Sequence, residues 1–228
     1  MKLPISPRLL ACAAFVAPGD RVADIGCDHG YLGIHLLENG IAKSVIAADI
    51  RQGPLSAAIR NGEKYAVGDR MSFHLSDGVQ SIPREFDTLV CAGMGGDTMI
   101  SILDAAPWLR NEQYRLILQC QSKTPMLRRY LLENGWRIEK EAVLRDGRFL
   151  YTVMEGRYQP QAQKPVAGQW YFPPVLLENP TPILKEYYNW VVGGLKIATA
   201  HTPDEEKLQG LHYLQNHPPL AFLKEEIL

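Results

Sequence analysis

Short apolar runs alternate with amphipathic segments through the first part of the chain. Five mostly apolar runs predict buried strands, at residues 21–25, 44–49, 71–75, 86–91 and 115–118. The intervening segments predict helices, at residues 31–38, from Pro54 onward, at 97–105 and from Thr124 to Asn134. Strands that alternate with helices form parallel sheets, and strands buried on both faces are apolar throughout. The pattern therefore predicts an α/β fold whose sheet is covered by helices on both faces.

Two further elements flank this α/β unit. Residues 136–144 and 148–154 alternate apolar and polar side chains around Asp146-Gly147, a strong turn signal. This pattern predicts an antiparallel hairpin at the edge of the sheet. Ahead of the first strand, Ser6 as N-cap and Pro7 in the first turn predict a short buried helix.

The last part of the chain is different in character. A polar, proline-bearing stretch at residues 159–165 predicts a linker, and residues 183–200, 204–215 and 221–228 have helical patterns without strands. We therefore expect two domains, an α/β domain at residues 1–157 and a helical C-terminal extension at residues 158–228.

Composition and charge narrow the class of protein. The 228 residues include 24 Lys+Arg and 25 Asp+Glu, and this balance excludes a uniformly cationic nucleic-acid coat while leaving room for a local basic patch. The four cysteines lack metal-ligand spacing, which favours reduced thiols in a cytoplasmic protein and no metal site. The apolar run after Arg8 is interrupted too early for a secretory leader, and no run approaches the ~18–20 residues of a membrane span. We expect a cytoplasmic monomer without a membrane segment.

Acidic and glycine-rich segments follow four consecutive strands. The first strand leads into residues 24–30, the second ends at Asp49, the third is followed by Asp77-Gly78, and the fourth by residues 92–96. Open parallel sheets bind ligands at the carboxyl ends of their strands. Four such segments in series therefore predict a site for a nucleoside-containing cofactor.

The loop after the first strand indicates which cofactor. Its glycines, Gly26 and Gly30, lack the middle glycine of a dinucleotide-binding loop, and Asp28 stands where a pyrophosphate would be repelled. These features favour S-adenosylmethionine, which has no phosphate. A nicotinamide-dependent oxidoreductase is the alternative from another enzyme class.

Carboxylates suit the polar groups of this cofactor. We expect Asp49 to accept both ribose hydroxyls, Asp77 to accept from the adenine amino group, and Asp24 to lie near the methionine ammonium. The complete candidate cofactor site is Asp24, Gly26, His29, Asp49, Ile50, Ser76, Asp77, Gly78, Ala92, Gly93 and Met94.

These motifs resemble those of a known family, the bacterial tRNA (adenine-N1)-methyltransferases that act at nucleotide 22 (TrmK family). The resemblance lies in Asp24-Ile25-Gly26-Cys27-Asp28-His29-Gly30-Tyr31-Leu32, in Ala92-Gly93-Met94-Gly95-Gly96, and in the Asn134-Gly135-Trp136 segment. It implies a Rossmann-like class I methyltransferase fold, with a mostly parallel seven-stranded sheet and a C-terminal antiparallel hairpin, plus a small helical domain. It also implies a tRNA partner. The sequence departs from the family at Asp49, where Glu is usual, and at Cys120-Gln121, where the family has Pro-Asn.

Methylation of adenine N1 sets the expected catalytic chemistry. N1 carries an in-plane lone pair at neutral pH and becomes cationic, so the site must align the base and stabilise positive charge without removing a proton beforehand. Asp28 is the catalytic candidate, because a carboxylate can orient the adenine amine and stabilise the developing cation. His29 is expected to shape the cofactor pocket, Cys27 to pack without a nucleophilic role, and Tyr31 either to stack on a base or to pack.

Substrate selection is read less directly from the sequence. Residues 93–96 lack the prolines and aromatic clamp of enzymes that methylate exocyclic amines, which favours a ring nitrogen. A methyltransferase of another RNA base or of a small molecule remains an alternative. For RNA contact, Arg128, Arg129, Arg145 and Arg148 are candidates to meet phosphates, with an ordinary solvated face as the other interpretation.

Overall fold

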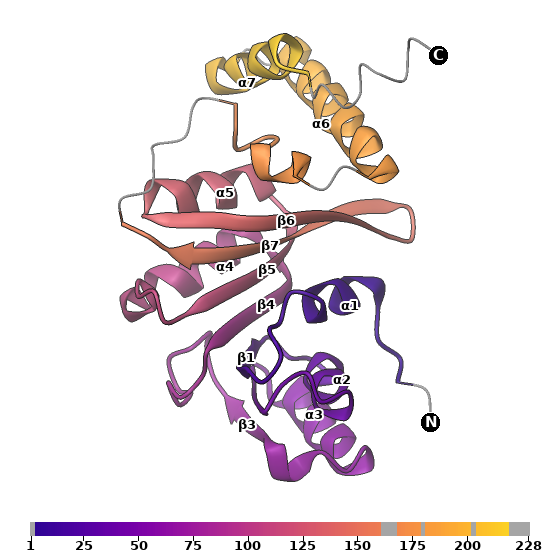
Figure 1. The fold of residues 1–228 in the computed structure, drawn as a ribbon, viewed down its shortest axis with the longest axis vertical. Helices are drawn as coiled ribbons and strands as arrows, with labels where there is room; N and C mark the ends of the chain where they lie inside the picture. The colour runs from indigo at the N-terminus through magenta and orange to yellow at the C-terminus, as the bar shows by residue number, and fades with distance from the viewer. Residues whose placement is uncertain (1–2, 161–167, 179–180, 202–203, 219–228) are drawn as a thin grey trace.

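The computed structural model describes residues 3–160, 168–178, 181–201 and 204–218, and its centre is a seven-stranded sheet (Figure 1). The strand order is β3-β2-β1-β4-β5-β7-β6. Strands β1 to β5 pair in parallel, whereas β7 is antiparallel to both β5 and β6. The strands are Arg21–Ile25 (β1), Ser44–Asp49 (β2), Met71–Leu75 (β3), Thr88–Gly95 (β4), Arg115–Ser122 (β5), Trp136–Asp146 (β6) and Phe149–Tyr158 (β7). The predicted mostly parallel sheet with an antiparallel C-terminal hairpin is confirmed.

Helices cover both faces of this sheet. Helices α4 and α5 pack on one face through Met99, Leu103 and Leu127, and helices α1, α2 and α3 pack on the other through residues that include Leu36 and Leu55. The helices are Pro7–Ala13 (α1), Tyr31–Glu38 (α2), Gln52–Lys64 (α3), Gly96–Asp104 (α4), Thr124–Glu133 (α5), Pro182–His201 (α6) and Glu205–Asn216 (α7). Of these described helices, none is long and apolar enough to cross a membrane.

The end of β4 differs from the prediction. We expected a strand at residues 86–91 followed by a glycine-rich turn, but β4 begins at Thr88 and continues to Gly95 with register shifts around Met94. The physical reason is at Gly93, whose φ of 80° turns the backbone while its N–H donates to the side chain of Gln119 at 3.1 Å. The strand therefore remains paired with β5 as it bends.

The C-terminal helices form a core of their own. Phe172, Tyr187, Leu195 and Leu214 are buried there, and this cluster packs against Val143 and other residues of the β6–β7 hairpin. The predicted helix at residues 221–228 and most of the predicted linker lie outside the described residues.

Arg128 joins this C-terminal core to the sheet domain, so the prediction that it meets phosphates is wrong. Its side chain is fully buried, and its Nη2 lies 2.6 Å from Glu141 Oε1 on β6. Its Nη1 donates to the carbonyl oxygens of Trp170 and Tyr171 at 2.9 and 3.0 Å, and Nη2 donates to the Tyr187 hydroxyl at 3.0 Å. Because an amphipathic helix places one face inward, this arginine points into the protein while its neighbour Arg129 is exposed.

Candidate functional site

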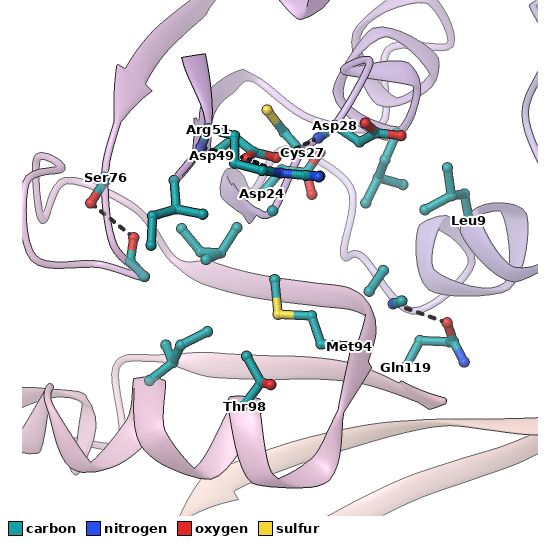
Figure 2. Close-up of a pocket in the computed structure, with 18 of the residues that line it drawn as sticks. Leu9, Asp24, Cys27, Asp28, Asp49, Arg51, Ser76, Met94, Thr98 and Gln119 are labelled. Atoms are coloured by element: carbon teal, nitrogen blue, oxygen red, sulfur yellow. Dashed lines mark hydrogen bonds and ion pairs between the residues drawn. The ribbon is translucent and has the colours of Figure 1, made fainter. Parts of the chain in front are cut away.

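A cavity of about 690 Å³ lies at the carboxyl ends of the parallel strands (Figure 2). Its volume is within the range of ~300–1,000 Å³ that is usual for small-molecule pockets. The structure brings every predicted site residue to the wall of this one cavity: Asp24, Gly26, Asp28, His29, Asp49, Ile50, Ser76, Asp77, Gly78, Ala92, Gly93 and Met94. In Figure 2, Asp24, Asp28 and Asp49 gather on one side, and Met94 and Thr98 lie opposite.

In the loop between β1 and α2, backbone N–H groups donate hydrogen bonds to acceptors within the protein. Gly26 and Cys27 both donate to the carbonyl oxygen of Ala48, at 2.8 and 2.9 Å, and Gly30 donates to Cys27 at 2.7 Å. The Asp28 N–H donates to Asp49 Oδ2 at 3.2 Å. A phosphate-binding loop offers such N–H groups to its ligand. Because these groups are already bonded within the protein, the loop is not built to hold a pyrophosphate.

Gly26 allows a close approach across the cavity. Its φ is 73°, and a Cβ at this position would lie 2.3 Å from the Cε of Met94. The left-handed backbone favours glycine here, and a Cβ would also push aside the flexible end of Met94. The loop after β1 and the bent end of β4 therefore meet here, and Figure 2 shows the Met94 side chain between the group of acids and Thr98.

Asp24 is a buried acid with one carboxylate oxygen that accepts no hydrogen bond from the described residues. Its residue is 3% exposed, and among the described residues no group donates to its Oδ2. Burial, followed by the nearby charge of Asp49, raises the pKa of Asp24 to about 7. An unpaired buried carboxylate is costly. A cationic ligand group at this wall would remove that cost, so the arrangement suits an ammonium.

Asp49 is also buried but is fixed in place. It accepts backbone N–H groups from Asp28 at 3.2 Å and from Arg51 at 2.9 Å, one on each carboxylate oxygen. The exposed Arg51 side chain lies 3.8 Å from Oδ1. Each oxygen of an ionised carboxylate has a further lone pair. Asp49 is therefore oriented to accept two hydroxyl groups from a ligand, as a ribose diol requires.

The end of the cavity beyond Asp49 combines an apolar surface with an acid. Ile50 is 62% exposed, a high value for isoleucine, and Asp77 follows β3, whose last residue pairs with Asp49, so both line the cavity near Asp49. Ser76 has a different role, because its hydroxyl donates to the Gly78 carbonyl at 3.0 Å and accepts the Ser81 N–H at 3.0 Å. Ser76 thus shapes the loop, while Ile50 and Asp77 remain available to a flat ring that carries an amino group.

Asp28 and its neighbours occupy the side of the cavity next to α1. Asp28 has a φ of 49°, and its side chain is 61% exposed. The rings of His29 and Tyr31 stack on each other with centroids 5.5 Å apart. Burial raises the pKa of the Cys27 thiol, which agrees with a packing role and not with a nucleophile.

Several cavity residues were not predicted from the sequence. Leu9 and Arg8 on α1 line the cavity, as do Thr98 on α4 and the two glutamines Gln119 and Gln121 on β5. Gln119 is fully buried and accepts the Gly93 N–H, so it supports the bent end of β4. From the sequence, we considered only acids and glycines at the carboxyl ends of strands. A glutamine in the same position could have indicated this residue.

The described residues hold no group of three or more His, Cys, Asp or Glu that is placed to bind a metal ion. The polar side chains of the cavity include the carboxylates of Asp24, Asp28, Asp49 and Asp77, together with amides and hydroxyls. The chemistry offered by these described residues is recognition of cations, hydroxyls and amines.

Sequence comparisons identify relatives of this chain. A family model described as a methyltransferase domain matches residues 5–154. The chain is 32% identical over 154 residues to the tRNA (adenine(22)-N(1))-methyltransferase of Bacillus subtilis, which covers 67% of this chain and 65% of that protein, just under two thirds of its length. It is 32% identical over 199 residues to a Mycoplasma pneumoniae protein provisionally named a tRNA methyltransferase, covering 84% and 88% of the two chains.

Solved structures extend the comparison to nearly the whole chain. The B. subtilis M1A22 tRNA methyltransferase TrmK matches with a TM-score of 0.78 and 25% identity over 98% of this chain and 99% of that one. Streptococcus pneumoniae Sp1610, provisionally assigned as a tRNA (m1A22) methyltransferase, was solved in complex with S-adenosyl-L-methionine. It matches with a TM-score of 0.82 and 27% identity over 93% and 98% of the two chains.

Proposed function

This chain belongs to the methyltransferase domain family, in the TrmK group of bacterial tRNA methyltransferases, and we propose from that premise that it transfers a methyl group from S-adenosylmethionine to N1 of adenine 22 in tRNA. The observation that carries the proposal is the acid-lined cavity, where the buried Asp24 Oδ2 has no donor among the described residues and the N–H groups of the β1–α2 loop are already bonded. This combination favours a cationic nucleoside without phosphate.

We assign each polar group of the cofactor to a different residue of the cavity. Asp24 would hold the methionine ammonium, Asp49 the two ribose hydroxyls, and Asp77 the adenine amino group beside the apolar Ile50. His29 and the backbone of the loops at Gly26, Ser76-Gly78 and Ala92-Gly93-Met94 would shape the remaining wall. When bound, S-adenosylmethionine supplies an electrophilic methyl group on a sulfonium that leaves as a neutral thioether.

Asp28 is proposed to act on the acceptor base. Adenine N1 needs no deprotonation before attack, so the protein has to position the ring and stabilise the positive charge that appears on it. The Asp28 carboxylate is exposed to the cavity and has room to accept from the exocyclic amine. As charge moves onto the ring, this hydrogen bond strengthens, which lowers the barrier to transfer.

The acceptor adenine has to leave its base pair to reach this carboxylate. N1 lies on the pairing edge of adenine, so the nucleotide must be flipped into the cavity. The side of the cavity formed by Leu9 of α1, Gly93 and Gln121 is the proposed acceptor pocket. This assignment leaves Asp24, Asp49 and Asp77 to the cofactor, while Asp28, which lies on the Leu9 side of Asp49 in Figure 2, is assigned to the acceptor.

The test is transfer of a labelled methyl group to a tRNA transcript, followed by nucleoside analysis. We expect 1-methyladenosine, and we expect it to be lost when adenine 22 is replaced by guanine. Detection of N6-methyladenosine or of a methylated guanosine would contradict the ring-nitrogen proposal. Transfer only to a small molecule would contradict the tRNA proposal.

Asp28→Asn tests the catalytic assignment in the same assay. We expect a loss of about 100-fold or more in the transfer rate, because an electrostatic contact made mainly in the transition state is removed. The affinity for S-adenosylhomocysteine should stay within about twofold, since Asp28 is not assigned to the cofactor. Asp69→Asn, an exposed acid on the turn Gly68–Arg70, is the matched control and should change neither quantity. An unchanged rate in Asp28→Asn would remove Asp28 from this role.

The proposal also includes two domains, residues 1–157 and residues 158–228. Catalysis is assigned to the first, the sheet domain, and both domains are proposed to contact the RNA. The cytoplasmic location and the monomeric state stay predictions.

A further inference from the structure

A row of two aromatic rings with a cation at each end leads from the cavity to the tip of the β6–β7 hairpin. Arg8 lines the cavity, and its Cζ lies 5.3 Å from the centre of the Tyr151 ring. The Tyr151 ring is 6.2 Å from that of Phe149, and the Arg148 Cζ lies 4.9 Å from the centre of the Phe149 ring. We call these four residues, Arg8, Tyr151, Phe149 and Arg148, the cation–aromatic row.

The row has a fixed place beside the cavity. Phe149 and Tyr151 are two residues apart on β7, so they lie on the same face of the strand. Asp146, which pairs with Phe149 across the hairpin, accepts from Arg8 Nε at 2.7 Å. This contact fixes the hairpin against α1 at the wall of the cavity.

The hairpin tip is also held by the C-terminal helices. Arg145, next to Asp146, forms an ion pair with Glu186 of α6. Figure 1 shows the β6–β7 hairpin extending past the other strands, with α1 on one side and α6 on the other. The tip is therefore a defined surface that bridges the two parts of the chain and adjoins the cavity.

The outer end of the row, Phe149 and Arg148, is exposed. Phe149 is 52% exposed, and among the described residues no carboxylate pairs with Arg148. Arg8, by contrast, is neutralised by Asp146. An exposed aromatic ring beside an unpaired cation fits nucleic acid, because rings stack on bases and cations meet phosphates. A protein partner would have to supply an acid for Arg148, whereas every nucleotide of an RNA supplies one.

From these observations we propose that the hairpin tip binds the RNA next to the target nucleotide, with an adjacent unpaired base on Phe149 and a phosphate on Arg148. The inference rests on the proposed function, in which the substrate is a tRNA. Flipping the adenine costs the stacking of its neighbours. Phe149 would offer one of those neighbours a new stacking surface close to the cavity.

Variants of Phe149 test the stacking contact. Phe149→Ala should raise the KM for tRNA by about fivefold or more, the lower end of the contribution of one stacked base. Phe149→Trp should keep the KM within about twofold, because the aromatic surface is retained. This variant also adds a fluorescent ring to the four native tryptophans, and tRNA should quench its emission more than that of the wild type. Both variants should bind S-adenosylhomocysteine as the wild type does.

Arg148→Gln tests the phosphate contact. We expect the dependence of log KM on log salt concentration to become shallower by about one, the change for one lost phosphate contact. Lys64→Gln is the matched control, because Lys64 also lies over an aromatic ring, that of Tyr65 at 5.6 Å, but at the C-terminal end of α3 and outside the cavity lining. Its salt dependence should equal that of the wild type.

The outcomes separate this inference from the proposed function. If the wild type methylates no tRNA, the proposed function fails. If it methylates tRNA and Phe149→Ala does so with an unchanged KM, only the hairpin surface is refuted. Weaker binding of S-adenosylhomocysteine by Phe149→Ala, or a dimer that this variant dissociates, would also overturn the inference, because Phe149 would then support the fold or a second copy of the chain.

Discussion

Replacing Asp24 by asparagine should make the protein more stable and at the same time abolish its cofactor affinity. The substitution keeps the shape of the side chain but removes its charge. In the protein without ligand, that charge is buried, lacks a donor at Oδ2 and lies near Asp49. With a ligand ammonium in place, the same charge is the main attraction.

The magnitude follows from the pKa of Asp24, which folding raises from 3.8 to about 7. A group whose pKa is higher in the folded state stabilises that state when protonated, and the benefit is lost as the pH rises toward the folded pKa. Between pH 5 and pH 7 the loss covers two pH units, which at ~1.4 kcal/mol per unit is on the order of 3 kcal/mol. The loss is complete about one pH unit above that pKa, near pH 8. The Asn variant does not titrate, so its stability advantage should grow by that amount between pH 5 and pH 8.

Urea unfolding at pH 5, 6, 7 and 8 measures this difference, and calorimetry with S-adenosylhomocysteine measures the affinity. In the wild type, affinity should fall about tenfold for each pH unit below 7, because the ionised form of Asp24 becomes the minority. In Asp24→Asn the affinity should be low and independent of pH over this range. A stability difference that does not change with pH, or a variant that binds as tightly as the wild type, would refute the reasoning.

Two further predictions concern the contact between the sheet and the C-terminal core, and the loop after β1. Arg128→Met should lower the free energy of unfolding by about 3–5 kcal/mol, because the buried Glu141 is left without its partner, and the double variant with Glu141→Leu should recover much of the loss in urea unfolding. Gly26→Ala should cost about 1–3 kcal/mol from the left-handed backbone and should also weaken S-adenosylhomocysteine binding, since the new Cβ displaces Met94. Met94→Ala in the same chain should restore part of that affinity, and a Gly26→Ala protein with unchanged affinity would show that this contact is unimportant.

The cavity wall could be predicted from the sequence because two local rules coincide. The bounds of β1, β2 and β3 follow from their apolar runs, and the structure has them at the predicted residues. The carboxyl ends of parallel strands meet at one edge of a sheet. Residues such as Asp24, Asp49 and Asp77, far apart in the sequence, therefore had to approach one another once the strands were assigned correctly.

The parts that were missed depend on tertiary contacts. Arg128 looks like any helix arginine in the sequence, and its burial is decided by Glu141 and by carbonyl groups of residues 170 and 171 that no local pattern connects to it. Helix α1 reads as a short buried helix, and nothing in its sequence says that Arg8 lines the cavity. The irregular end of β4 has the same origin, because Gln119 on the neighbouring strand accepts the Gly93 N–H.

The hydrogen bonds that one loop forms within the protein explain the choice of cofactor. In the β1–α2 loop, the N–H groups of Gly26 and Cys27 donate to the Ala48 carbonyl and that of Asp28 donates to Asp49. A dinucleotide would need those groups for its pyrophosphate, so the same contacts that build the loop exclude it. The contact from Asp28 also helps to orient Asp49, and nearby Asp24 has a buried oxygen that accepts no hydrogen bond from the described residues. Binding of a cationic nucleoside therefore relieves a cost that the fold itself creates, which is why stability and function should change in opposite directions at Asp24.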